Sequence, residues 1–134
     1  MASMKARKGN PMEFNTAYSL LQSGYIVERS DMNVAGVDLV VKNKSMETLY
    51  YVECKHHKGF SWNELIKYFN KTKKHCTGSI KPMLIFRANN QPVLIMLEQG
   101  DSKVVLEYND FFMTAWSKRP TGYKLWKNNE SSEN

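Results

Sequence analysis

The segment VAGVDLVVKNKSMETLYYVECK, residues 34–55, decides the fold of this chain. It holds two runs rich in β-branched and aromatic residues, at 34–41 and 48–55, on either side of a polar turn at 43–45. Runs of this composition around a short turn predict two strands paired as an antiparallel hairpin. We therefore expect these two runs to lie side by side in one sheet.

The residues before this hairpin predict a helix and a first strand. Asn10 can cap the helix, Pro11 suits its first turn, and Glu13 lies three residues after the cap. Apolar residues recur at helical spacing from there, and Gly24 is expected to end the helix. Residues 25–29 predict a short strand that enters the hairpin through a turn.

The residues after the hairpin predict a second helix and more strands. Ser61 and Glu64 form a capping box at the start of a helix whose apolar positions run to Cys76, with Gly78 expected to stop it. Strands are expected at 82–86, 93–97 and 103–107, and a short helix at 110–116. This order predicts a single α/β domain with a mixed central sheet flanked by helices.

Length and composition agree with one domain. The 134 residues fit one hydrophobic core, with a basic N-terminal arm at 1–9, the domain at 10–127 and a flexible polar tail at 128–134. No apolar run approaches the roughly 20 residues that a membrane span needs, so no membrane association is expected. Cys54 and Cys76 form neither a disulfide framework nor a zinc-binding pair, which favours a cytoplasmic location.

The charge of the chain points toward a polyanion as partner. The formal net charge is +6, and lysine and arginine gather in short clusters along the sequence. A basic domain of this size often binds nucleic acid, although many basic domains do not. Composition alone therefore leaves DNA binding open.

The candidate chemistry lies in Asp38, Glu53 and Lys55, which interrupt apolar strands. A charge in such a position is costly unless it is paired or binds a metal. Strand side chains alternate between faces, so Glu53 and Lys55 share one face, and the hairpin brings Asp38 beside them. Two carboxylates and an ammonium suit Mg²⁺-assisted phosphodiester hydrolysis. The alternative, an ordinary exposed ion pair next to a turn-end carboxylate, remains open at this point.

The pattern of Asp38 followed by Glu53-Cys54-Lys55 resembles the catalytic motif of the PD-(D/E)xK nuclease superfamily. Val37 stands where that motif has proline. The stretch from Lys8 to Glu13 also resembles the Lys-Gly-x-x-x-Glu that opens the first helix of archaeal-type Holliday junction resolvases. The resemblance covers residues 7–87 and implies a restriction-endonuclease-like fold.

The resemblance implies a Mg²⁺- or Mn²⁺-dependent endonuclease that resolves four-way DNA junctions as a homodimer. Asp38 and Glu53 would bind the ion directly together with the backbone carbonyl of Cys54, Lys55 would position the attacking water, and Glu13 would hold the metal through water. Glu13 also suits a plain capping role. Because segment 29–38 is shorter than the corresponding resolvase loop, a restriction, repair or phage DNA-processing nuclease of the same fold remains an alternative. A non-catalytic DNA-binding module is a further alternative, although the intact set of acidic residues argues against it.

Several basic and polar residues outside this motif are candidate DNA contacts. They could equally form solvated surface, the usual role of the outer face of an amphipathic helix. A zinc role for His56 and His57 is disfavoured, because neighbours on a strand face opposite ways. The aromatic residues at 111, 112, 116 and 126 either cover the core or form a dimer surface. The candidate DNA contacts are Lys5, Arg7, Lys8, Arg29, Ser30, His57, Lys58, Lys67, Lys71 and Lys74.

Overall fold

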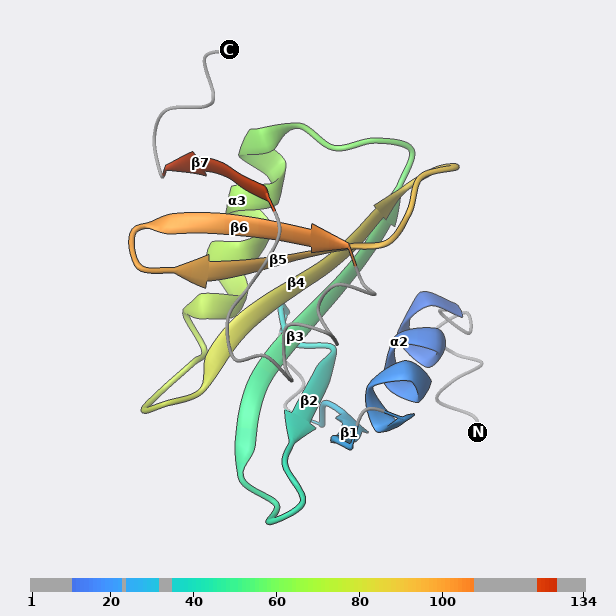
Figure 1. The fold of residues 1–134 in the computed structure, drawn as a ribbon, viewed down its shortest axis with the longest axis vertical. Coiled ribbons are helices and arrows are strands. Elements are labelled where there is room, and N and C mark those ends of the chain that lie inside the picture. Colours follow the sequence, from blue (N-terminus) through green and yellow to red (C-terminus); the bar gives the residue numbers. More distant parts are fainter. Residues whose placement is uncertain (1–10, 23, 32–34, 108–122, 128–134) are drawn as a thin grey trace.

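A computed structural model describes residues 11–22, 24–31, 35–107 and 123–127, with the side chains of 11–14, 18, 22 and 123–127 left undescribed. Seven strands form one sheet in the order in which they occur along the chain (Figure 1). All neighbouring strands are antiparallel except the central parallel pair β3 and β4. The strands are β1 (Ile26–Arg29), β2 (Leu39–Lys42), β3 (Thr48–His57), β4 (Lys81–Ala88), β5 (Leu94–Gln99), β6 (Ser102–Glu107) and β7 (Tyr123–Lys127).

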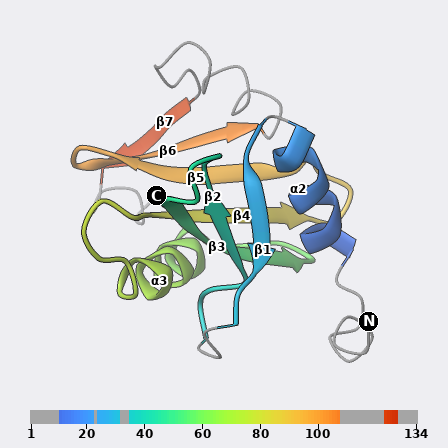
Figure 2. The same ribbon diagram turned by 90° about the horizontal axis from the view of Figure 1, so that it is seen from below.

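Two helices cover the sheet from opposite sides. Helix α2 (Pro11–Gln22) inserts Leu20 into a core cluster that includes Val52 and Cys54 of β3. Helix α3 (Trp62–Lys73) inserts Leu65 and Phe69 into a second cluster on the other face. The turned view separates the two helices, with the strands between them (Figure 2). The mixed central sheet flanked by helices, predicted from the sequence, is confirmed.

Helix α3 connects β3 to β4 and makes their parallel pairing possible, because parallel strands need a crossover. Its start follows the predicted capping box. The side-chain oxygen of Ser61 accepts a hydrogen bond from the Glu64 amide at 3.1 Å, and the Glu64 carboxylate accepts one from the Ser61 amide at 3.0 Å. These reciprocal bonds satisfy backbone donors that the first helical turn leaves without partners.

The hairpin prediction is confirmed, but the start of its first strand was predicted too early. β2 begins at Leu39, because Gly36 takes a positive φ of 100° and its carbonyl bonds to Thr72 rather than to a neighbouring strand. Asp38 therefore immediately precedes β2. The second strand is longer than predicted, since β3 and β4 stay paired as far as His57 and Ala88.

Other differences concern element ends. Helix α3 ends at Lys73 rather than near Gly78, because the amides of His75 and Cys76 bond to carbonyls three residues back instead of four. Strand β7 was not predicted, and it pairs with β6. The arm at 1–9, the expected helix at 110–116 and the tail at 128–134 lie outside the described residues. No helix in the described part of the chain is long and apolar enough to cross a membrane.

Candidate active site

Asp38 lies directly before β2, at the end of the β2–β3 hairpin that is away from its turn. Its backbone still follows the sheet, since its amide donates to the Val52 carbonyl at 2.7 Å and its carbonyl accepts from the Ser30 amide at 2.9 Å. Its carboxylate oxygen Oδ2 accepts a hydrogen bond from the amide of Cys54 at 2.8 Å. The Asp38 carboxylate is thereby fixed beside the residue that follows Glu53.

Glu53 and Lys55 face α3. Their partners across the parallel pair, Leu84 and Phe86, belong to the core cluster under that helix, whereas Cys54 belongs to the opposite cluster. Glu53 is only 4% exposed, and its Oε2 lies 3.2 Å from the Lys55 ammonium. The same-face prediction is therefore confirmed. The burial of Glu53 does not match an ordinary exposed ion pair.

Helix α3 contributes two residues that the sequence did not single out. The hydroxyl Oγ1 of Thr72 donates to the Gly36 carbonyl at 2.6 Å and lies 3.4 Å from Glu53 Oε1. The ring of Tyr68, one turn earlier, lies with its centroid 4.7 Å from the Lys55 ammonium. Such a contact attracts the ammonium through the ring quadrupole. The only sequence signal for both residues is their spacing of four on one helix.

A turn at Ala35 and Gly36 brings Asp38 to this place. The turn is held against the end of α3, since a ring nitrogen of His75 lies 3.1 Å from the Ala35 carbonyl. A side chain at Gly36 would begin 3.1 Å from the aliphatic stem of Lys71. The close approach and the positive φ both favour glycine at this position.

The donor set suits a hard divalent cation. The carboxylate of Glu53 and that of Asp38, which accepts a hydrogen bond from the Cys54 amide, supply hard oxygen ligands. The amide of Cys54 projects toward Asp38, and since N–H and C=O of one strand residue point the same way, its carbonyl projects toward Asp38 too. Within the described residues no group of three His, Cys, Asp or Glu side chains could hold a metal. A metal here would need backbone and water oxygens, as Mg²⁺ commonly uses.

The structure describes some of the other predicted site residues and leaves others out. Glu13 lies in α2 with its side chain outside the described set, and Lys5, Arg7 and Lys8 lie outside it altogether. Ser30 bonds to the Asp38 carbonyl, the stem of Lys71 lies beside Gly36, and Arg29 is the β1 partner of Leu39. His57 stacks on Phe60, with ring centroids 4.8 Å apart, and contacts the edge of Tyr68. The exposed lysines of this set are Lys58, Lys67 and Lys74.

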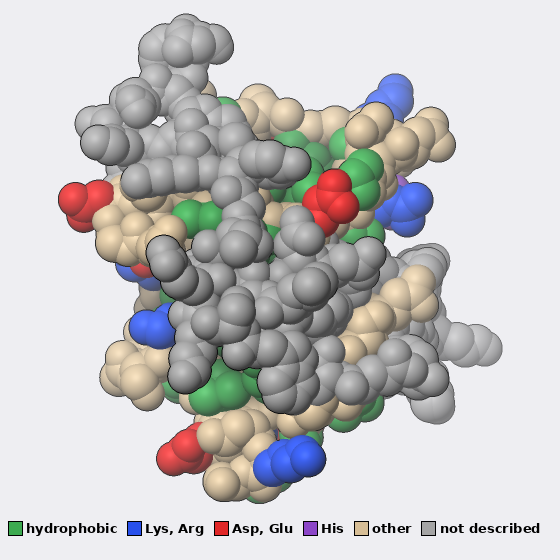
Figure 3. Space-filling model, in the orientation of Figure 1, with side chains coloured by type: hydrophobic (Ala, Val, Ile, Leu, Met, Phe, Trp, Pro, Cys, Tyr) green, Lys and Arg blue, Asp and Glu red, His purple; other side chains and the backbone are tan. Residues whose placement is uncertain are grey.

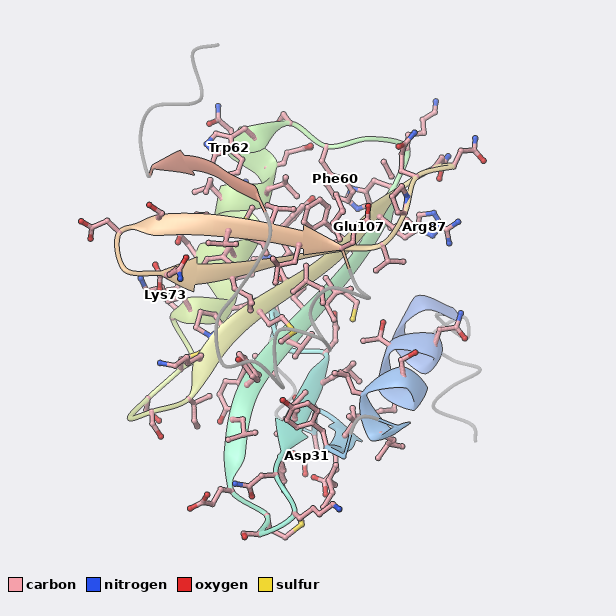
Figure 4. All side chains as sticks on the ribbon, in the orientation of Figure 1. Asp31, Phe60, Trp62, Lys73, Arg87 and Glu107 are labelled. Atoms are coloured by element: carbon pink, nitrogen blue, oxygen red, sulfur yellow. The ribbon has the colours of Figure 1, made fainter. Side chains whose placement is uncertain are left out.

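Figure 3 shows the molecule from the side of the sheet opposite α3. On the face shown there, the described lysine and arginine side chains stand near the margins of the view (Figure 3). Figure 4 places Phe60 and Arg87 toward the end of the sheet where β3 and β4 finish, well away from Lys73. Lys55 pairs with Glu53 and Lys73 with Glu98, so the two lysines belong to separate ion pairs.

Comparison with known proteins gives one family. A model described as "Phage putative PDDEXK endonuclease" matches residues 6–131. The chain belongs to this PD-(D/E)xK endonuclease family. Its match spans Asp38, Glu53 and Lys55, the residues that carried the resemblance seen in the sequence.

Two further comparisons add little to this assignment. No curated protein matches the chain. Among solved structures, the Holliday junction resolvase Hjc of Archaeoglobus fulgidus is similar at 12% identity and a TM-score of 0.42, with 69% of this chain and 85% of that chain covered. The family match therefore carries the assignment of the chain to nucleases.

Proposed function

We propose that this chain is a Mg²⁺-dependent DNA endonuclease whose metal ligands are the carboxylates of Asp38 and Glu53 and the backbone carbonyl of Cys54. The observation that carries this proposal is the hydrogen bond from the Cys54 amide to Asp38 Oδ2 at 2.8 Å. It holds one carboxylate beside the segment of β3 that carries Glu53 and Lys55 on the face toward α3. The membership of the chain in a PD-(D/E)xK family supports the same site.

Each residue has a definite task in this mechanism. Mg²⁺, when bound, stabilises negative charge on the phosphate and lowers the pKa of a coordinated water. Asp38 and Glu53 supply the hard oxygen ligands that such an ion prefers. Lys55 orients the attacking water and offsets charge that develops on the phosphate oxygens. Tyr68 keeps the Lys55 ammonium over its ring and so limits the directions in which it can point.

Branched DNA, and a four-way junction in particular, is the proposed substrate. The support is the Lys8-to-Glu13 stretch at the start of the first helix, which resembles the corresponding stretch of archaeal-type resolvases. Glu13 would then hold the metal through a water molecule from α2. A homodimer follows from this substrate, because two strands of a junction must be cut and each copy provides one site.

A phage DNA-processing nuclease with a different preferred DNA structure is the second candidate. The description of the matching family, which names phage endonucleases but no junction, favours it. The two candidates share the active site and the ion. They differ only in which DNA structure is bound. Comparing the cleavage of several DNA structures therefore distinguishes them.

The test is cleavage of a synthetic four-way junction, a flap, a nicked duplex and a linear duplex with Mg²⁺. Paired symmetric nicks in the junction that vanish in Asp38→Asn and Glu53→Gln would support the resolvase. Equal cutting of linear duplex would leave the endonuclease and discard the junction preference. DNA binding with no cleavage, and no Mg²⁺ or Mn²⁺ binding at millimolar concentration, would instead identify a non-catalytic DNA-binding module.

A further inference from the structure

Thr72 is a completely buried polar residue whose hydroxyl bonds outside its own helix. A helical threonine commonly bonds the carbonyl four residues earlier, here that of Tyr68. That contact is long, at 3.4 Å, whereas the carbonyl of Gly36 lies 2.6 Å from Oγ1. A hydroxyl has one proton to donate, so the short contact is the hydrogen bond that is made. Thr72 therefore ties α3 to the turn that precedes Asp38.

The same hydroxyl lies beside the second carboxylate. Glu53 Oε1 is 3.4 Å from Thr72 Oγ1, while Glu53 Oε2 is 3.2 Å from the Lys55 ammonium. The Glu53 carboxylate is thus confined between α3 and Lys55. One buried side chain contacts both of the chain segments that supply the proposed metal ligands.

The turn held by Thr72 has little freedom to move. Gly36 is two residues before Asp38, and α3 also approaches it through the Lys71 stem, while His75 lies against Ala35. Loss of the Thr72 hydrogen bond would leave the Gly36 carbonyl without this partner. The backbone between Gly36 and Asp38 would then be less constrained. Groups that orient metal ligands in this way typically change metal affinity about 10–100-fold when they are mutated.

We propose that Thr72 is a positioning residue, which sets the separation of the Asp38 and Glu53 carboxylates and thereby the affinity of the site for a divalent ion. This inference rests on the proposed function, since it needs those two carboxylates to bind the metal. It assigns to the end of α3 a role in the metal site in addition to its role in covering the sheet.

The test uses the full chain and measures Mn²⁺ binding by titration calorimetry. Thr72→Val keeps the shape of the side chain and removes the hydroxyl, whereas Thr72→Ser keeps the hydroxyl. We expect the Mn²⁺ Kd of Thr72→Val to rise at least about 10-fold and that of Thr72→Ser to change by less than about 3-fold. Ser102→Ala, which removes a buried hydroxyl from β6, is the matched control and should bind like the wild type.

Two results would overturn the positioning role alone: wild-type Mn²⁺ affinity in Thr72→Val, or equal losses in Thr72→Val and Thr72→Ser. If Thr72→Val does not fold, Thr72→Ser is compared with Thr72→Cys, a weaker donor of similar size, and equal affinities would overturn it. If the wild type binds no Mn²⁺, the metal site of the proposed function fails and the positioning role fails with it.

Discussion

Two groups of charged side chains face α3, and they differ in charge balance. In the first, the carboxylate of Glu53 lies 3.2 Å from the ammonium of Lys55, and the carboxylate of Asp38 accepts a hydrogen bond from the amide of Cys54. In the second, the single carboxylate of Glu98 has two ammonium groups, with Lys73 at 2.8 Å and Lys103 at 3.3 Å. Both groups combine an acid with lysine, yet only in the second do two ammonium groups lie against one carboxylate.

This difference favours the first group as the place for a cation, because Glu98 already has two cationic partners. Burial by itself would raise the pKa of Glu98, but its hydrogen bond to Lys73 and the charge of Lys103 outweigh burial, so the pKa lies below its ordinary value. Lys103 is almost fully buried beside Glu98, with its ammonium 5.0 Å from the centre of the Phe69 ring. We infer that the Glu98 group stabilises the fold, whereas the Asp38–Glu53 group serves chemistry.

The largest expected effect is on cleavage. Glu53→Gln should lower the rate of DNA cleavage by more than about 100-fold, because it removes a proposed metal ligand, and even residues that only orient ligands cost up to that much. Glu98→Gln, the matched change in the other group, should leave the rate within about twofold of the wild type once the protein is folded. Steady-state cleavage with Mg²⁺ checks both, and similar losses in the two variants would contradict the comparison.

The second effect is on stability, and here the larger loss is expected in the Glu98 group. Glu98→Gln leaves the buried Lys103 ammonium without its carboxylate, and breaking a buried pair costs about 3 kcal/mol. Lys73→Gln, at a half-exposed ammonium on the same carboxylate, should cost less than about 1 kcal/mol. Urea denaturation gives both values. Equal costs would mean that the burial of Lys103 does not matter.

The third effect concerns DNA binding and compares lysines in and directly after α3. Each lysine that contacts a phosphate contributes about 0.9 to the slope of log affinity against log salt. Replacing Lys67, Lys71 and Lys74 by glutamine should flatten that slope, whereas Lys73→Gln should not, because Lys73 already pairs with Glu98. Fluorescence anisotropy with labelled DNA measures the slopes. A flattening in Lys73→Gln alone would reverse the assignment.

A fourth effect tests the turn before Asp38. Gly36→Ala imposes a side chain at a φ of 100° and 3.1 Å from the Lys71 stem, so it should cost about 1–2 kcal/mol of stability. Gly100→Ala, also at positive φ but in open space, serves as the control for φ alone. Only Gly36→Ala should also weaken Mn²⁺ binding in calorimetry. Equal Mn²⁺ affinities in both variants would separate this turn from the metal site.

The smallest effect is on pH dependence. Because the pKa of Glu98 is lower in the folded protein, its contribution to stability is present above its unfolded value of about 4.3 and is lost as pH falls through the folded value. The wild type should therefore lose stability more steeply than Glu98→Gln below about pH 4.3. Thermal unfolding across that range measures the difference, and parallel curves would argue against it.

The sequence predicted the hairpin, the α3 capping box and the shared face of Glu53 and Lys55, because strand alternation and capping are local patterns. It could not predict Thr72, since its bond to Gly36 spans 36 residues and a threonine in an amphipathic helix carries no distinguishing pattern. The burial of Lys103 could not be predicted either, because a lysine in a strand is normally exposed. The early start predicted for β2 failed for a similar reason: the positive φ of Gly36 depends on its contact with α3.

Anomalous diffraction from a crystal soaked in Mn²⁺ would test the proposed metal site, because it locates the ion without relying on activity. We expect a peak within coordination distance of the Asp38 and Glu53 carboxylates and the Cys54 carbonyl. A peak beside Glu98, or no peak at these three oxygens at millimolar Mn²⁺, would contradict it.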